Sequence, residues 1–155
     1  EKLIDYCAID IKNSPAHYAD TVGLSSIDLG PLRESVDCLL SLNGSFPYEF
    51  RTTIVKELHS EEDMYAIGEW IAGADQYFLQ SYTDSDQVIS SGYHAHDTDT
   101  LQHFASICRQ TIPNVQHTSF LFSAHEKILQ PPFAFLSKNP PRQAMKYPLL
   151  SLCCI

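Results

Sequence analysis

The stretch Ile4-Asp5-Tyr6-Cys7-Ala8-Ile9-Asp10-Ile11-Lys12-Asn13 decides the fold, because it is typical of a buried β-strand that ends in a charged pair. Side chains on a strand alternate between two faces, so Asp10 and Lys12 lie on one side and Ile9 and Ile11 on the other. A carboxylate and an ammonium on an otherwise apolar strand must be paired, hydrated or bound to a ligand, since an isolated buried charge is costly. An α/β barrel presents catalytic groups in this way, at the carboxyl ends of its strands.

Strand-like and helix-like segments alternate along the following hundred or so residues. The patterns predict strands over 4–11, 48–55, 77–82 and 115–122. They predict helices over 15–22, with Ser14 as the cap, over 31–43, from the cap Ser60 to Gly73, and from the cap Asp97 or Asp99 to Pro113. Strands that alternate with helices imply parallel pairing through right-handed crossovers.

The domain organisation follows from this alternation and from its end. Residues 1–120 are predicted to form one α/β unit, which has too few βα repeats to close an eight-stranded barrel. Residues 121–155 are punctuated by prolines, as irregular or extended segments are, and are predicted to be a Pro-rich tail of unclear order.

Composition and charge exclude several classes of function. The chain has 155 residues, of which 44% are hydrophobic, so it can build a core. Its net charge of −9 argues against non-specific nucleic-acid binding and against an anionic membrane surface. No apolar run approaches the ~20 residues that span a bilayer, and no signal peptide opens the chain. We therefore expect a cytoplasmic protein, and a chain that begins with Glu1 is expected to be a piece of a longer one.

The cysteines are scattered and odd in number, which does not resemble a disulfide framework. Reduced thiols in a reducing compartment are the expectation. None of them forms a CxxC or CxxxCxxC cluster, so the chain carries no local zinc or iron–sulfur motif. The adjacent Cys153-Cys154 is a poor chelate for one metal ion.

Polar side chains alternate along each predicted strand instead of the continuous Val/Ile/Leu run of a buried parallel strand. Asp10 and Lys12 share a face of the first strand, Glu49, Arg51 and Thr53 of the second, and Phe78, Gln80 and Tyr82 of the third. One interpretation is a polar interior that binds a small anionic or zwitterionic ligand at the strand ends. The alternatives are charges that cancel on a solvated sheet face, and strands at the edge of an oligomer interface.

Several pieces of the sequence, in their joint order, resemble the carboxyl-terminal half of a radical S-adenosylmethionine activating enzyme. They are AIDIKNSP at 8–15, YADTVG at 18–23, YEFRTTIVKELH at 48–59, Trp70-Ile71 and Phe78-Leu79-Gln80. The run is similar to anaerobic ribonucleoside-triphosphate reductase activating proteins and, more distantly, to pyruvate formate-lyase activating enzyme. The resemblance covers about residues 1–117 and implies part of an incomplete, TIM-like (β/α)6 barrel.

The resemblance also implies a chemistry and a set of site residues. The family holds a [4Fe–4S] cluster and S-adenosylmethionine and makes a glycyl radical on a partner enzyme through a 5′-deoxyadenosyl radical. Asp10 and Lys12 would lie by the methionyl group, Arg51 would face the cofactor, and Gln80 and Tyr82 would close the adenosine side. The family's CxxxCxxC loop is not present in the 155 residues, so we expect the chain to be inactive alone and unable to hold the cluster.

Other hypotheses remain open beside the enzyme fragment. The chain could be a non-catalytic half barrel that binds a nucleoside-like ligand or a protein, or a structural product whose open edge pairs with a second copy to form a homodimer. The motif His94-Ala95-His96-Asp97 could chelate a metal ion or be a polar loop in which Asp97 caps the next helix. His59 could touch a substrate at the mouth of the site or be an ordinary loop histidine.

Overall fold

A computed structural model describes residues 4–84, 92–118 and 152–154 of the chain. Five strands form one sheet in the order β4-β3-β2-β1-β5. The strands are β1 (Cys7–Asp10), β2 (Tyr48–Ile54), β3 (Tyr77–Ser81), β4 (Val115–Thr118) and β5 (Leu152–Cys154). The first four pair in parallel with their sequence neighbours, whereas β5 runs antiparallel to β1. The predicted α/β class with parallel βα repeats is confirmed.

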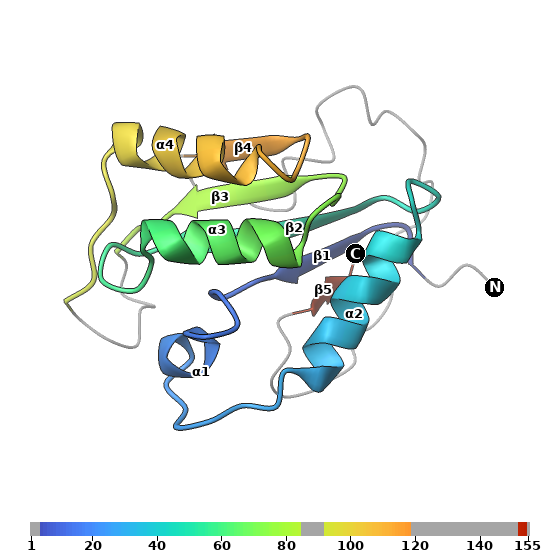
Figure 1. The fold of residues 1–155 in the computed structure, drawn as a ribbon, viewed down its shortest axis with the longest axis horizontal. Coiled ribbons are helices and arrows are strands. Elements are labelled where there is room, and N and C mark those ends of the chain that lie inside the picture. Colours follow the sequence, from blue (N-terminus) through green and yellow to red (C-terminus); the bar gives the residue numbers. More distant parts are fainter. Residues whose placement is uncertain (1–3, 85–91, 119–151, 155) are drawn as a thin grey trace.

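The helices all lie on one side of this sheet, as Figure 1 shows. They are α1 (Tyr18–Thr21), α2 (Gly30–Ser41), α3 (Glu61–Trp70) and α4 (Thr98–Cys108). Crossovers between parallel strands are right-handed, so strands that are added always in the same direction keep their helices on the same face. The described sheet is therefore wound in one direction only.

The alternation of side chains divides the sheet into two unlike faces. The helix-covered face carries Ile9, Phe50 and Leu79, which are buried in the core together with Val36 of α2 and Ile67 of α3. The opposite face, which we call the polar face, carries Ala8, Asp10, Glu49, Arg51, Thr53, Phe78 and Gln80, as the pairing register shows. The prediction that the polar groups of neighbouring strands share one face is confirmed.

The start of the first helix differs from the prediction. Ser14 does not cap a helix over 15–22, because α1 is one short turn whose N-cap is His17. The Ser14 hydroxyl donates instead to the Asp63 carboxylate at the start of α3. A carboxylate is a stronger acceptor than any group that a one-turn helix offers, so this long-range contact replaces the local cap.

Two other predicted helix starts are borne out. Ser60 caps α3 in a reciprocal capping box with Asp63, and Asp97 caps α4 by accepting from the Thr100 amide. The predicted end of the second helix at Asn43-Gly44 is also correct, since both residues adopt positive φ after α2 ends at Ser41.

Part of the predicted carboxyl-terminal organisation lies outside the described residues. Of the predicted strand 115–122, residues 115–118 form β4 and 119–122 are not described. Within the predicted tail, Leu152–Cys154 pair with β1 as its second neighbour, and residues 121–151 and 155 are not described. In the described residues no helix has the length and apolarity needed to cross a membrane.

Candidate functional site

The carboxyl ends of β1 and β2 bring three of the predicted site residues together. Asp10 and Arg51 are register partners on the polar face, and Arg51 Nε lies 3.2 Å from Asp10 Oδ1. Lys12, just beyond β1, places its Nζ 3.1 Å from Asp10 Oδ2. The Asp10 carboxylate therefore stands between an ammonium and a guanidinium. The convergence that the sequence predicted for these three groups is present.

Glu49 extends this charged group toward the amino end of β2. Its carboxylate is 3.7 Å from Arg51 Nε and accepts a hydrogen bond from the Tyr6 hydroxyl. Burial and this bond raise the pKa of Tyr6, so the phenol stays protonated and donates. Glu49 is 2% exposed, which makes it the most enclosed carboxylate of the polar face. Two carboxylates and two cations thus balance in charge across β1 and β2.

The Arg51 guanidinium is close to the carboxylates but is not bonded through its Nε. That nitrogen is buried and makes no hydrogen bond within the described structure, although its side chain is only 14% exposed. A buried N–H without an acceptor is costly, because it has lost its water and gained nothing. The arrangement can accept an additional oxygen ligand at this nitrogen.

Gln80 and Tyr82 lie apart from the Asp10 group. Gln80 is buried on the same face, on the strand beyond Arg51, and its register partner on β4 is Thr118. The Thr118 hydroxyl oxygen is buried there without a hydrogen bond among the described residues. Tyr82 follows β3 and its hydroxyl donates to Asp84. No hydrogen bond or ion pair between described residues joins Gln80 or Tyr82 to Asp10, Lys12 or Arg51.

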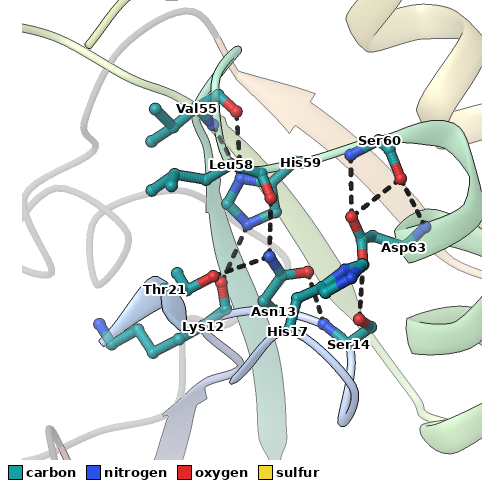
Figure 2. A network of polar contacts seen from close by, with 10 residues as sticks. All are labelled: Lys12, Asn13, Ser14, His17, Thr21, Val55, Leu58, His59, Ser60 and Asp63. Atoms are coloured by element: carbon teal, nitrogen blue, oxygen red, sulfur yellow. Dashed lines mark hydrogen bonds and ion pairs between the residues drawn. The ribbon is translucent and has the colours of Figure 1, made fainter. Parts of the chain in front are cut away.

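A second polar assembly, which the sequence did not predict, surrounds Asp63 at the loops beyond the strand ends (Figure 2). One Asp63 oxygen accepts from the Ser14 hydroxyl and lies 2.7 Å from His17 Nδ1. The other accepts from the amide and the hydroxyl of Ser60 at 3.0 and 2.9 Å. Burial opposes the ionisation of Asp63, but these bonds outweigh it and lower the pKa to about 2. Asp63 therefore joins the loop after β1 to the start of α3.

His59 belongs to the same region and is not a group that meets solvent. It is 4% exposed, and its Nε2 lies 2.9 Å from the Lys12 carbonyl oxygen. Its Nδ1 accepts from the Val55 amide at 3.1 Å. Of the two hypotheses for His59, the structure supports the structural one, because backbone groups occupy both ring nitrogens.

An open depression of about 340 Å³ lies beside the Asp63 assembly. His17, Thr21, Lys56 and Glu57 are among the residues that line it, and none of the predicted site residues does. The sequence predicted one cavity around Asp10, Lys12 and Arg51, and this depression lies elsewhere. Ion pairing explains the difference, since it draws those three side chains onto one another across the sheet face rather than around a hollow.

The histidine motif 94–97 does not form a metal site. His94 Nδ1 lies 2.7 Å from Glu57 Oε1, the His96 ring packs edge-on against Phe104, and Asp97 caps α4. No group of three or more His, Cys, Asp or Glu side chains in the described ranges could hold a metal ion. The cysteines Cys7, Cys38 and Cys108 are free thiols.

The ionisation of the His17–Asp63 pair gives a first prediction. The hydrogen bond and charge of Asp63 raise the pKa of His17. The stability that a raised pKa confers is fully present below the ordinary pKa of 6.5 and is lost as the pH rises through the folded pKa. We expect an NMR titration to place the His17 pKa above 6.5 in the wild type and closer to 6.5 in Asp63→Asn. A wild-type value at or below 6.5 would contradict the pairing.

These features define the class of the protein. It is an α/β protein whose parallel sheet carries helices on one face and, on the other, a buried set of paired charges at the ends of β1 and β2. No protein-family model and no curated protein matches the chain.

Proposed function

We propose that this chain forms the carboxyl-terminal half of a radical S-adenosylmethionine activating enzyme, and that its polar face binds S-adenosylmethionine. The observation that carries the proposal is the convergence of Lys12 and Arg51 on Asp10 at the carboxyl ends of adjacent parallel strands. In α/β proteins ligands bind at these ends, whatever the particular chemistry.

The direction in which the sheet is wound supports a partial (β/α)6 barrel. An open, doubly wound sheet reverses its strand order and places helices on both faces. In the described sheet the order β1-β2-β3-β4 never reverses and the helices share one face. When such a sheet curls, its helix-free face becomes the interior, and here that face carries Asp10, Glu49, Arg51 and Gln80. A polar interior is suited to a polar ligand.

The residues of the polar face fit the methionyl end of S-adenosylmethionine. The ligand's ammonium matches the Asp10 carboxylate, which is one-quarter exposed. Its carboxylate matches the Lys12 ammonium and the unbonded Nε–H of Arg51. Gln80, with Tyr82 further along the same strand direction, lies toward the side on which the adenosine would rest.

The [4Fe–4S] cluster of the family does not fit the residues present. The five cysteines include no CxxxCxxC spacing, and the described residues offer no three-ligand metal group. In the activating enzymes, S-adenosylmethionine supplies the 5′-deoxyadenosyl radical that takes hydrogen from a glycine of the partner enzyme. For this chain we propose the binding of S-adenosylmethionine and its orientation toward such a glycyl-radical enzyme, with cluster ligands from outside the 155 residues.

Isothermal calorimetry tests the binding proposal. We expect the wild-type chain to bind S-adenosylmethionine, and Arg51→Ala to weaken the affinity by about tenfold or more, since the ligand carboxylate loses a desolvated cationic partner. Thr53→Ala is the matched control, because Thr53 shares the polar face and the strand but is exposed. Absence of binding by the wild type, or equal affinities of Arg51→Ala and wild type, would refute the proposal.

Anaerobic reconstitution with iron and sulfide tests the statement about the cluster. We expect no stable [4Fe–4S] cluster on the chain alone, because scattered single cysteines cannot surround one iron–sulfur cube. Visible absorbance after desalting gives the measurement, with a ferredoxin reconstituted in parallel as the positive control. A stable cluster at a ratio of one per chain would show that the ligands are present after all.

A non-catalytic half barrel that binds a nucleoside-like ligand or a protein is the second candidate. The balance of the carboxylates of Asp10 and Glu49 against Lys12 and Arg51 favours it, because a neutral face needs no charged ligand. The same calorimetry separates the two candidates. Adenosine that binds as tightly as S-adenosylmethionine, with no effect of Arg51→Ala, would support the second.

A further inference from the structure

Four consecutive residues after β1 are each bonded to the segment that runs from β2 to the start of α3. Ile11 O accepts from Thr52 Oγ1 at 2.7 Å, Lys12 O from His59 Nε2 at 2.9 Å, Asn13 Nδ2 donates to Leu58 O at 2.8 Å, and Ser14 Oγ donates to Asp63. We call this set of contacts the clasp, most of which Figure 2 shows. It continues past the sheet ladder, whose last register pair between these strands is Asp10 and Arg51.

His59 is the member of the clasp that acts on Lys12. Burial lowers its pKa, so the ring is neutral, with one nitrogen that donates and one that accepts. Since Nδ1 accepts from the Val55 amide, the hydrogen is on Nε2 and is donated to the Lys12 carbonyl oxygen. One side chain therefore joins the backbone just after β1 to the backbone just after β2.

We propose that His59 is a positioning residue for the polar site, and that it fixes the Lys12 backbone so that the ammonium reaches Asp10 beside Arg51. The proposal rests on the function proposed above for the ligand, but not for the geometry. Lys12 lies beyond the ladder and its side chain is 44% exposed, so its own contacts do not hold it. The buried bond from His59 supplies that restraint from the neighbouring strand end.

Two substitutions separate positioning from mere stability. In His59→Gln the amide nitrogen reaches the place of Nε2 and keeps a donor for Lys12 O, whereas in His59→Asn the shorter side chain keeps a group near Nδ1 alone. Both lose the ring and are expected to lose similar stability in urea unfolding. We expect His59→Asn to weaken S-adenosylmethionine binding by about tenfold, and His59→Gln to stay within about threefold of the wild type.

A second measurement needs no ligand. The ¹⁵N signal of the Lys12 ammonium reports its pairing with Asp10, and we expect it to change in His59→Asn and to stay near the wild-type position in His59→Gln. If this pattern appears while the wild type binds no S-adenosylmethionine, positioning stands and the proposed function fails. If the two variants behave alike in the ammonium signal, the positioning role is refuted, whatever the wild type binds.

Discussion

Replacing Asp63 with alanine is expected to destabilise the fold by about 2–4 kcal/mol, the sum of a lost helix cap and lost hydrogen bonds to a buried carboxylate. Asp63 is 3% exposed and accepts from Ser14 and from both the amide and hydroxyl of Ser60. Alanine leaves these donors without an acceptor in a region closed to water. It also frees His17, which loses its ion-pair partner.

Urea unfolding at neutral pH measures this effect, and Ser60→Ala is the matched control. That variant removes the cap hydroxyl but keeps the carboxylate with Ser14 and His17, so we expect a loss of about 1 kcal/mol. The lowered pKa of Asp63 adds a pH test: its contribution is present above the ordinary pKa of 3.8 and is lost as the pH falls through about 2. An Asp63→Ala variant as stable as Ser60→Ala would mean that the contacts to the loop after β1 contribute nothing.

Replacing Phe50 with alanine is expected to cost about 3–5 kcal/mol, because it empties a large volume in a close-packed core. Phe50 is fully buried on the helix-covered face of β2 and packs edge-on against the Tyr48 ring at 5.5 Å. Three residues further along the same strand, Thr53 points to the opposite face and is exposed. Thr53→Ala is therefore expected to change stability by no more than about 0.5 kcal/mol.

The comparison of Phe50 with Thr53 tests the assignment of the two sheet faces. If Phe50→Ala is too unstable to purify, Phe50→Leu gives a smaller loss of about 1–2 kcal/mol that is still measurable by urea unfolding. A Thr53→Ala variant that loses as much as the Phe50 variants would place the core on the wrong face and overturn the register of β2.

The candidate site shows how far sequence periodicity reaches. The spacing of Asp10 and Lys12 was enough to predict a shared face and a pair, because alternation along a strand is a property of the backbone itself. Arg51 could be added because parallel strands end at the same edge of a sheet. The capping box Ser60–Asp63 has a local signature in the sequence, and only its role as a cap was predictable from it.

The other partners of Asp63 carry no such signature. Ser14 and His17 are 49 and 46 residues away from it, and no local pattern marks either as its partner. Ser14 was assigned to a helix cap for this reason. His59 reads as an ordinary loop histidine until its distance to the Lys12 carbonyl is known. The position of the depression, away from the charged group, likewise follows from how the loops pack.

The amino-acid sequence by itself determined the α/β class, the parallel order of the strands, the caps of α3 and α4, and the gathering of polar side chains on one sheet face. Each of these depends on near neighbours in the chain, whose geometry is set by backbone periodicity and by local hydrogen bonding. Tertiary structure alone decided that Asp10 is shared by Lys12 and Arg51, that Asp63 and His59 join the loops of β1 and β2, and that β5 pairs with β1. These contacts join residues that become neighbours only when distant segments pack, since the direction of a side chain limits its partners without choosing among them.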